Sequence, residues 1–510
     1  MTTLRSEIVV VGAGISGIAS VIKLKEAGFA DVVVLERGDD VGGCWSTQKY
    51  PGLTIDVPSM YYSYSWAQKP DWSSAWTPGP EMHEYCRNVV EQFGVRDKFR
   101  FGVQVTGSTY DEKRNEWVTE TADGTRYVSR YLLNASGVLS ELKWPEIEGM
   151  KDFQGTLLHT SAWDENLDFT GKRVAIIGTG ATGIQLAPEI APQAGQLDVY
   201  QRTPIWLLPK PAFKLKPRTQ KAFATVPGLL RAARFGIAFL MDIVFFQSFV
   251  NYPTMGPLTR LAEKVGRRHI NRQVDDPEVA RKLTPDYDWG CKRPSFSQNF
   301  YPMFNRSNVE LVTDSIERFT PTGIVTADGV EHETDIVICA TGYQPFSGRS
   351  LPTYPVRGRG GQDLRDYWEN NRYQAFQGVT VHGYPNFFLI FGPYNNISGS
   401  YIAGVELSVR NMVTALKGAR KKRANYIEVD AAAQRREFEE IIAKQPKSIF
   451  QAGNCTGSNT YYIDAHGDTP LMRPSNHLKE WIAARRGDLS PYHIRSVADA
   501  TSKKRTLSRR

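Results

Sequence analysis

Cysteines are few in this sequence, and their spacing suggests no pairing. Only five occur among 510 residues, and no two of them form a C-x-x-C motif. This pattern argues against a disulfide framework and against a zinc ribbon, and it favours a reducing compartment. We therefore expect no metal site. The five are Cys44, Cys86, Cys291, Cys339 and Cys455.

A long uninterrupted hydrophobic run is also missing. Residues 231–250 come closest, but Arg231, Arg234, Asp242 and Gln247 interrupt them. Since a membrane-spanning helix needs about 20 mostly apolar residues, this stretch predicts a buried or surface-lying helix. The first predicted strand begins near Glu7, which leaves no room for a signal peptide. The expected location is the cytoplasm.

Acidic residues do not balance the basic ones, and the net charge is +8. Part of the basic excess lies in residues 417–423 and 498–510. Such stretches usually form solvated surface, and weak peripheral contact with an anionic membrane stays open as an alternative. No nucleic-acid-binding module accompanies them, so we expect no nucleic-acid partner. The G-x-S-x-G elbow of an esterase is absent too, because Gly14–Gly17 lacks its spacing.

What the chain does contain is two glycine-rich turns. Each follows a short apolar strand and opens a predicted helix. A G-x-G-x-x-G motif in this context brings the backbone close to a pyrophosphate at a helix N-terminus. The chain therefore predicts two dinucleotide-binding units. Their glycines are Gly12, Gly14 and Gly17 in the first unit and Gly178, Gly180 and Gly183 in the second.

The residue that follows the second strand differs between the two units. Glu36 stands nineteen residues after Gly17, and Arg202 stands nineteen residues after Gly183. A carboxylate can accept hydrogen bonds from the ribose hydroxyls of an adenosine, whereas it would repel a 2′-phosphate. Arg202, with Thr203 beside it, suits that phosphate. We therefore expect FAD in the first unit and NADPH in the second.

Residues 42–56 form a turn-rich segment between the two units. The pair Gly42 and Gly43 fits a close passage of backbone past the flavin pyrophosphate, and Asp56 follows a Pro-Gly turn that would aim it at a site. Trp45 and Tyr50 could belong to this site or could be ordinary core aromatics, an interpretation that suits Tyr50 better.

Two segments resemble the type I Baeyer–Villiger monooxygenases, a family of class B flavoprotein monooxygenases. Phe153, Gly155, His159 and Trp163 match the motif F-x-G-x-x-x-H-x-x-x-W-[PD], and residues 42–56 match [AG]-G-x-W-x-x-x-x-[FY]-P-[GM]-x-x-x-D. Both segments lie between the two glycine turns. The resemblance therefore covers most of the chain.

The resemblance also implies roles for individual residues. Arg293 would be the active-site arginine, Asp56 its catalytic partner, and Lys292 a second ligand of the NADP 2′-phosphate. A peroxyflavin anion needs a fixed cation in a dry site, and arginine keeps its proton there. The family fingerprint containing His159 would couple the domains, with His159 holding the linker between them.

By resemblance, the reaction would be the insertion of one oxygen atom of O₂ next to a ketone carbonyl, giving an ester or lactone. FAD and NADPH would be the cofactors, a flavin C4a-peroxide the intermediate, and a ketone the substrate. The resemblance leaves open which ketone is oxidised and the oligomeric state. Gln451–Pro470 would be a mobile loop over the nicotinamide, with Tyr461 where relatives often have tryptophan.

The expected fold class is α/β, with two Rossmann-like dinucleotide-binding domains and a helical insertion. We assign residues 1–144 and 335–510 to a discontinuous FAD domain, and residues 145–207 and 285–334 to the NADP domain. Residues 208–284 would be a helical insertion that lines the substrate cleft. A stripe of phenylalanines in it could face this cleft or simply form core. They are Phe235, Phe239, Phe245, Phe246 and Phe249.

Three other functions share parts of this pattern. A flavin-containing monooxygenase that forms N- or S-oxides is the main alternative, and Trp163 argues against it because that family carries Tyr or Phe there. A disulfide reductase would need a redox-active cysteine pair. A non-catalytic nucleotide sensor would not need Arg293.

Overall fold

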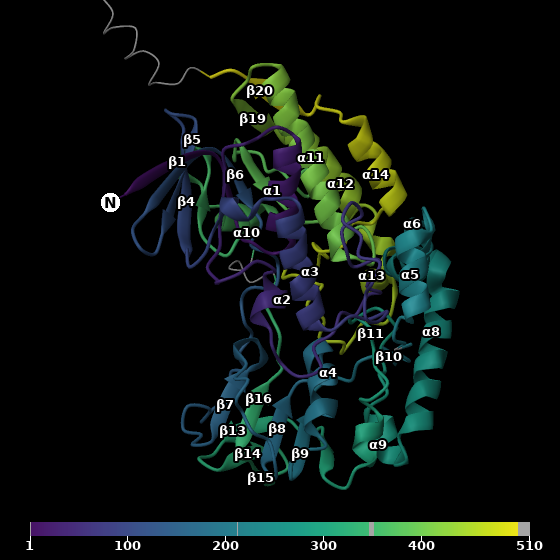
Figure 1. Ribbon diagram of the computed structural model, residues 1–510. Coiled ribbons are helices and arrows are strands. Elements are labelled where there is room, and N and C mark those ends of the chain that lie inside the picture. Colours follow the sequence, from purple (N-terminus) through teal and green to yellow (C-terminus); the bar gives the residue numbers. More distant parts are fainter. Residues whose placement is uncertain (1, 212, 346–350, 498–510) are drawn as a thin grey trace, which may run out of the picture.

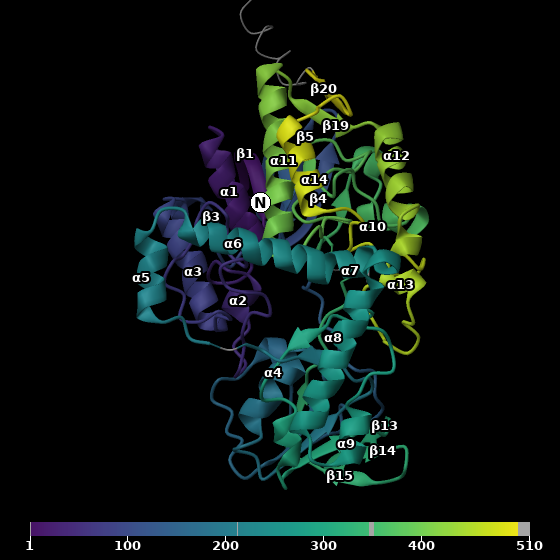
Figure 2. The same ribbon diagram turned by 90° about the vertical axis from the view of Figure 1, so that its right-hand side faces the viewer.

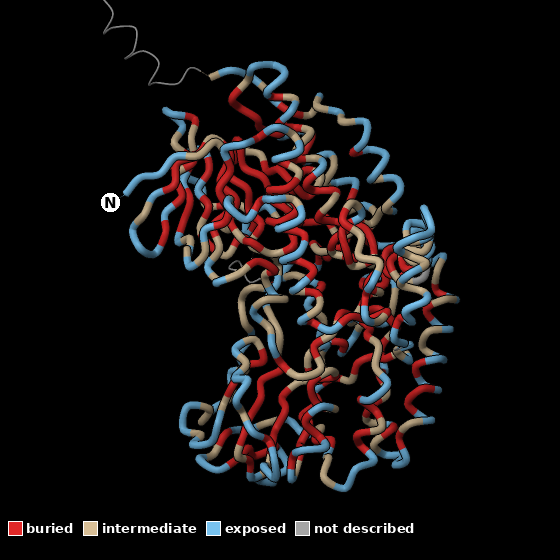
Figure 3. The backbone as a smooth tube through the Cα atoms, viewed as in Figure 1, coloured by how far each residue is buried: buried red, intermediate tan, exposed pale blue. Residues whose placement is uncertain are grey.

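The computed structural model describes residues 2–211, 213–345 and 351–497. Two sheets lie at opposite ends of the molecule, and long helices run along one side of both (Figure 1). In Figure 3 the strands of both sheets are red, so each sheet lies in a core of its own. Parallel strands covered on both faces need such continuous apolar runs.

The first sheet is mixed and has eight strands. Its order is β17-β4-β5-β6-β1-β2-β3, and β18 also pairs with β6. The parallel partners of β1 are β2 and β6, while β4 and β5 form an antiparallel excursion. The strands are β1 (Thr3–Val11), β2 (Val32–Leu35), β3 (Phe99–Arg100), β4 (Val105–Asp111), β5 (Glu116–Thr121), β6 (Arg126–Asn134), β17 (Val356–Arg357) and β18 (Phe387–Leu389).

Helices from both parts of the chain cover this first sheet. The helix α1 (Ile15–Glu26) packs beside α11 (Tyr401–Lys421), and the hydroxyls of Ser16 and Tyr401 lie 2.9 Å apart. The first sheet is thus built from both ends of the chain. The remaining elements are α2 (Cys44–Thr47), α3 (Gly79–Gln92), α10 (Leu364–Asn371), α12 (Ala431–Ile442), α13 (Ile449–Ala452), α14 (His477–Arg486), and the antiparallel pair of β19 (Tyr426–Val429) and β20 (Tyr492–Arg495).

The second sheet is parallel and has the order β12-β9-β8-β16-β7. An antiparallel sheet of β13 (Ile316–Phe319), β14 (Gly323–Thr326) and β15 (Glu331–Glu333) lies next to it. The parallel strands are β7 (Thr156–His159), β8 (Arg173–Ile177), β9 (Gln196–Tyr200), β12 (Val309–Val312) and β16 (Ile336–Cys339), with α4 (Ala181–Ile190) after β8.

The boundary that we expected at residue 335 is wrong for one strand. β16 pairs with β7 and β8, so residues 336–339 belong to the second sheet and not to the first. The chain crosses back only afterwards, where the amide of Lys143 donates to Gly342 O at 2.9 Å. The two crossing segments thus run side by side. The apolar run 336–339 alone could not show which sheet it joins, because both sheets bury such strands.

Helices dominate residues 208–284, as predicted. α6 (Leu229–Leu240) continues through a π-helical turn at Met241–Phe246 into α7 (Gln247–Val250), and Figure 2 shows them crossing one face of the molecule. The other helices are α5 (Pro217–Thr225), α8 (Tyr252–Gln273) and α9 (Pro277–Lys282), and β10 (Leu207–Leu208) pairs with β11 (Ser295–Phe296) at the base of the insertion. In the described ranges, no helix is both long and apolar enough to traverse a bilayer.

The phenylalanine stripe does not form one cleft lining. Phe235 and Phe239 are exposed, 72% and 59%, whereas Phe246 and Phe249 lie in a hydrophobic cluster with Trp206 and its neighbours. The hypothesis of a shared cleft is therefore wrong for the two residues on α6. The helix turns them outward because its other face, with Ala233 and Ile237, packs against the protein.

Candidate active site

The first glycine turn has the geometry expected of a dinucleotide site. Gly12 has a φ of +104°, and a Cβ there would come within 2.5 Å of Ala135 O, while a Cβ on Gly17 would collide with Gly12 O. Gly14 lies against Gly43, which approaches it from the predicted turn segment. No side chain caps the N-terminus of α1. The turn thus leaves a bare helix end, which suits a pyrophosphate.

Glu36 lies directly beside this turn. Its carboxylate accepts the amide of Ala13 at 2.7 Å and the amide of Gly38 at 2.8 Å. A carboxylate has about four acceptor positions, so it keeps acceptor positions for ribose hydroxyls. Trp45 on α2 packs edge-on against Tyr62 at 5.8 Å, and its buried indole nitrogen has no hydrogen-bond partner among the residues that the structure describes.

The second turn repeats the first. Gly178 has a φ of +109°, and a Cβ on Gly183 would collide with Gly178 O. Gly180 differs, because a Cβ there would meet nothing within 4 Å. It caps α4 without a side-chain hydrogen bond. Gly180 therefore has no packing reason to be glycine, and the open space beside it is where a cofactor would approach.

Three residues at the end of β9 and in the segment before β11 form a cationic site. The Lys292 ammonium donates to Thr203 O at 3.4 Å, and Arg202 is exposed. Burial and, to a lesser extent, the positive charge of Arg202 together lower the pKa of Lys292 to about 8. Two cations held close together without an anion between them repel each other. An anion such as a phosphate would reduce this repulsion.

Arg293 and Asp56 form an ion pair, with Arg293 Nη2 2.9 Å from Asp56 Oδ1. They are 237 residues apart in sequence. Asp56 is the main cause of the raised pKa of Arg293, and Tyr462, Tyr461 and Tyr62 add to it. The arginine side chain is still 45% exposed. Its guanidinium is thus held by one carboxylate and remains open to a ligand on its other side.

Several residues that no sequence motif had indicated support this pair. Lys210 donates to Thr54 Oγ1 at 2.6 Å, and burial lowers its pKa. Gln185 on α4 accepts from the Tyr50 hydroxyl at 3.0 Å and donates to Thr54 O at 3.1 Å. These contacts tie the turn before Asp56 to the second domain. The Pro-Lys-Pro segment around Lys210 was the available signal, but its partner is remote in sequence.

The expectation of unpaired cysteines is wrong. Cys291 and Cys455 form a disulfide with a Cα–Cα distance of 5.2 Å, whereas Cys44, Cys86 and Cys339 are free. The bridge joins the residue before Lys292 to the predicted nicotinamide loop. Spacing could not reveal it, because 164 residues separate the two cysteines.

The predicted nicotinamide loop also contacts the cationic site. Asn459 Nδ2 donates to Thr203 Oγ1 at 2.6 Å, and Tyr461 stacks at an angle on the buried Tyr462 with their rings 4.7 Å apart. The loop therefore lies over the residues that we assign to the NADP phosphate.

In the family fingerprint the ring of Phe153 lies against Gly155, whereas His159 and Trp163 contact other aromatic residues. His159 ends β7, is 1% exposed, and lies near the two crossing segments, 5.3 Å from the ring of Trp144 and 6.4 Å from that of Tyr343. Phe153 instead packs on Phe319. A Cβ at Gly155 would come within 2.5 Å of Asp335 O, and Trp163 packs on Phe169.

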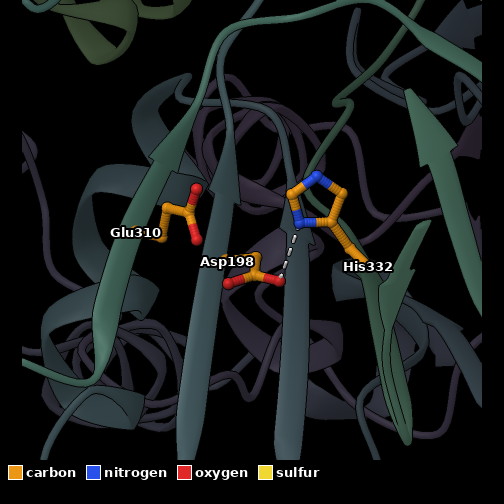
Figure 4. A group of neighbouring side chains, drawn as sticks. All are labelled: Asp198, Glu310 and His332. Atoms are coloured by element: carbon orange, nitrogen blue, oxygen red, sulfur yellow. Dashed lines mark ion pairs between the residues drawn. The ribbon is translucent and has the colours of Figure 1, made fainter. Parts of the chain in front are cut away.

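Another cluster of ionisable side chains lies on the second sheet (Figure 4). Asp198 on β9 and Glu310 on β12 are neighbours in the parallel ladder, and His332 Nδ1 on β15 lies 3.6 Å from Asp198 Oδ2. Burial raises the pKa of Asp198. These contacts join the antiparallel sheet to the parallel one, and we assign the cluster a packing role.

Comparisons with known proteins identify the family. A family model described as pyridine nucleotide-disulphide oxidoreductase matches residues 9–232. The Baeyer–Villiger monooxygenase of Pseudomonas aeruginosa is 32% identical over 489 residues, which cover 96% of this chain and 91% of that protein. This chain belongs to the Baeyer–Villiger monooxygenases.

Further matches agree with this assignment. The Baeyer–Villiger monooxygenase of Streptomyces coelicolor is 31% identical over 97% of this chain and 93% of its own length. A solved steroid monooxygenase bound to NADP has a TM-score of 0.84 at 28% identity, covering 97% of this chain and 100% of that one. A closed cyclohexanone monooxygenase has a TM-score of 0.86 at 27% identity, with the same coverage.

These comparisons confirm the predicted resemblance to the type I Baeyer–Villiger monooxygenases. They also confirm the two Rossmann-like domains, the monooxygenase activity and the cofactors FAD and NADPH. It also decides against a disulfide reductase. The absence of a cysteine pair, which we used against that function, no longer holds, because the structure pairs Cys291 with Cys455.

Proposed function

We propose that Arg293 is the catalytic cation of this Baeyer–Villiger monooxygenase and that Asp56 positions it. The observation that carries this proposal is the 2.9 Å ion pair between two residues from different domains. Arg293 keeps its charge because Asp56 raises its pKa. A fixed, preorganised cation stabilises negative charge that develops during a reaction.

The residues of the first turn fit FAD. The close approach of Gly43 to Gly14 leaves no side chain between the backbone and a pyrophosphate, and the N-terminus of α1 is uncapped. Glu36 would accept the adenosine ribose hydroxyls, and the unpartnered indole nitrogen of Trp45 supplies a free donor. These residues, together with Gly12 and Gly17, would hold the flavin cofactor.

The residues of the second turn fit NADPH. The turn of Gly178, Gly180 and Gly183 would let the backbone approach the pyrophosphate closely. The 2′-phosphate would be held by Arg202, Thr203 and Lys292. The depressed pKa of Lys292 supports this assignment, because a bound phosphate would relieve the repulsion from Arg202.

When bound, FAD and NADPH would supply the hydride transfer and the activation of O₂ by which one oxygen atom is transferred to a ketone. The protein holds the ketone beside Arg293, between the turn that carries Asp56 and the helical insertion. The half-buried Tyr62 and the buried Tyr462 lie near this guanidinium. They would exclude water and favour an apolar ketone.

The domain division that we propose has the second sheet end at residue 339, with residues 208–284 as an insertion beside the cleft. We also propose a cytoplasmic location, where NADPH is supplied; the cysteines no longer support it, because Cys291 and Cys455 are paired. Cell fractionation tests the location: recovery of the protein outside the cytoplasm and its inner membrane surface would contradict it.

The roles of Arg293 and Asp56 are tested by product analysis. We expect Arg293→Ala to consume NADPH while forming hydrogen peroxide instead of ester, with ester formation falling about 10²- to 10³-fold. Arg293→Lys should recover only part of the activity, because lysine lacks the planar fork of donors. Arg318→Ala, a surface arginine on β13, is the matched control.

A panel of ketones, an amine and a sulfide should be offered in this experiment, with ester, N-oxide and S-oxide measured. An unchanged ratio of ester to NADPH in Arg293→Ala would contradict the proposal. Exclusive oxidation of the amine or sulfide by the wild type would favour the activity of a flavin-containing monooxygenase.

A further inference from the structure

One helix of the insertion presents an apolar face to solvent. On α6, Phe235 and Phe239 are one turn apart, are 72% and 59% exposed, and have ring centroids 6.5 Å apart. Leu240 and Leu229 at the two ends of the helix are exposed as well. Single exposed apolar side chains are normal, but a stacked pair on one helix face needs an explanation.

The orientation of α6 is fixed by contacts on its other face. Arg234 donates to the carbonyls of Met60 at 2.9 Å, Tyr61 at 3.0 Å and Ser63 at 2.8 Å. Ile237 packs against the cluster that contains Tyr61. Because these contacts hold the inner face, the protein always presents Phe235 and Phe239 on the outside.

A second helix extends this apolar face. α14 begins beside the continuous helix α6–α7, where Gln247 Nε2 on α7 donates to Ser475 O, just before α14, at 3.1 Å. Leu478 is 65% exposed on α14, and Trp481 and Ile482 are exposed next to it. Figure 2 shows both helices on the side of the molecule that faces the viewer, and Figure 1 shows both at its right-hand edge.

The segment that contains α5 and α6 carries charge of only one sign, although the exposed Asp71 lies against α5, where Gln220 Nε2 donates to its carbonyl at 3.4 Å. No aspartate or glutamate occurs between Asp198 and Asp242, and this stretch contains eight lysines and arginines. Those in and around α5 and α6 are exposed on the described part of the chain: Lys214, Lys216, Arg218, Lys221 and Arg231. An apolar stripe flanked by basic side chains is the pattern of a helix that lies in a membrane interface.

We propose that this face, formed by α5, α6 and the start of α14, docks on the surface of an anionic lipid membrane. Phe235, Phe239 and Leu478 would enter the boundary between headgroups and acyl chains. The surrounding lysines and arginines would contact lipid phosphates. The chain would then lie on the membrane without crossing it.

Charge favours a membrane over a second copy of the chain. In a two-fold dimer the same patch meets itself, so the acid-free stretch would face an identical cationic stretch. Such like-charge contact is unfavourable. An anionic lipid surface has the complementary charge.

This docking would also bring the active site close to a reservoir of apolar compounds. The cluster on the inner face of α6 includes Val57, the residue after Asp56. A ketone dissolved in the membrane would reach the cleft through the insertion. This last step rests on the function proposed above, whereas the docking itself does not.

Vesicle flotation of the purified FAD-loaded protein tests the docking. We expect binding to vesicles of phosphatidylcholine mixed with phosphatidylglycerol, weaker binding to phosphatidylcholine alone, and a decrease with added salt. The double variant Phe235→Ser, Phe239→Ser should bind at least about tenfold more weakly, since each phenylalanine loses its buried apolar area. Lys221→Glu combined with Arg231→Glu should remove the preference for anionic lipid.

The control is Val330→Ser, which replaces an exposed apolar residue in the turn between β14 and β15. It should bind like the wild type. Flavin content and activity on a water-soluble ketone should be unchanged in every variant, which separates this proposal from the catalytic one. No binding of the wild type to either vesicle, or equal binding by the phenylalanine double variant, would overturn it. Self-association that the double variant abolishes, without vesicle binding, would identify a dimer interface instead.

Discussion

At the scale of single residues, the two cofactor sites differ in how their charges are satisfied. Glu36 is already held by two backbone amides, whereas Lys292 donates to the Thr203 carbonyl and the charge of Arg202 helps to lower its pKa. The first site therefore has its charge in place before any ligand arrives. The second becomes favourable only when an anion binds.

This difference predicts a pH dependence of NADPH binding. The pKa of Lys292 is about 8 in the free protein, and a phosphate binds its protonated form. The affinity for NADP⁺ should therefore be highest below pH 8 and should fall as the pH rises through that value. Isothermal titration calorimetry between about pH 7 and pH 9.5 measures it.

NADH is the control for this prediction, because it lacks the 2′-phosphate. Its weak binding should change little over the same range. Lys292→Ala should weaken NADP⁺ by about 1.5–3 kcal/mol, the value of a hydrogen bond to a charged group, and should remove the pH dependence. A pH profile that survives this substitution would assign the titration to another group.

Asp56 acts through Arg293, and its loss should affect turnover more than binding. We expect Asp56→Asn to lower kcat by about 10- to 100-fold, because the guanidinium loses its fixed orientation. The KM for NADPH should change much less. Asp56→Glu should recover part of kcat; a larger effect on KM than on kcat would show that Asp56 supports the cofactor site instead.

At the scale of elements, the two glycine turns have similar backbone conformations, but the glycines within them differ in whether a Cβ atom would fit. Gly17 and Gly183 allow their helices to pack against the preceding turn, where any Cβ would collide with a carbonyl. Gly180 has open space instead. One motif thus contains glycines needed for folding and a glycine needed only for the ligand.

Alanine substitutions should separate these two roles. Gly183→Ala should lower stability by about 1–3 kcal/mol through overpacking, with a lower Tm even without cofactor. Gly180→Ala should keep the Tm of the wild type and bind NADP⁺ about tenfold or more weakly. Equal effects of both on Tm would contradict the assignment of Gly180.

The disulfide between Cys291 and Cys455 should confine the loop over the NADP site. We expect Cys455→Ser to raise the KM for NADPH about fivefold, because a loop that is not held must be ordered on binding. Peptide mapping of the unreduced wild type should link the two cysteines. Reductant should move the wild type toward the variant and leave the variant unchanged; a reductant effect on both would point to another thiol.

At the scale of the whole molecule, two crossing segments connect the domains, and His159 lies near both. The ring of His159 is buried near Trp144 and Tyr343, and its Nδ1 accepts from the Ser161 amide at 3.2 Å. Burial lowers its pKa. The neutral imidazole therefore suits a structural role at the linker better than proton transfer.

The lowered pKa of His159 predicts an acid-sensitive fold. Above the unfolded value of about 6.5, folded and unfolded chains both hold a neutral ring. Below it, the unfolded chain gains a proton that the folded chain resists, so the free energy of unfolding falls as the pH drops. His159→Gln should flatten this decrease between about pH 7.5 and pH 5.5 in urea unfolding.

Other buried histidines limit the size of that change. Burial also lowers the pKa of His269 and His477, so the variant should keep part of the slope. His493→Gln, an exposed histidine on β20, is the control. An unchanged slope in His159→Gln would show that the linker histidine is protonated in the folded protein.

The sequence by itself determined the elements that depend on local chemistry. Short segments of sequence predict the two strands, the two glycine turns and the difference between Glu36 and Arg202. This is possible because backbone strain and phosphate chemistry act over a few residues. The resemblance to the family further predicted Asp56, Lys292 and Arg293 as site residues. The structure brings Asp56 and Arg293 together as an ion pair.

Only the tertiary structure decided what depends on residues far apart in the chain. It placed strand 336–339 in the second sheet, paired Cys291 with Cys455 across 164 residues, and brought Lys210 to Thr54. It also turned Phe235 and Phe239 outward, although their spacing equally suits a core. Burial and long-range pairing are set by how whole elements pack, and no local pattern contains that information.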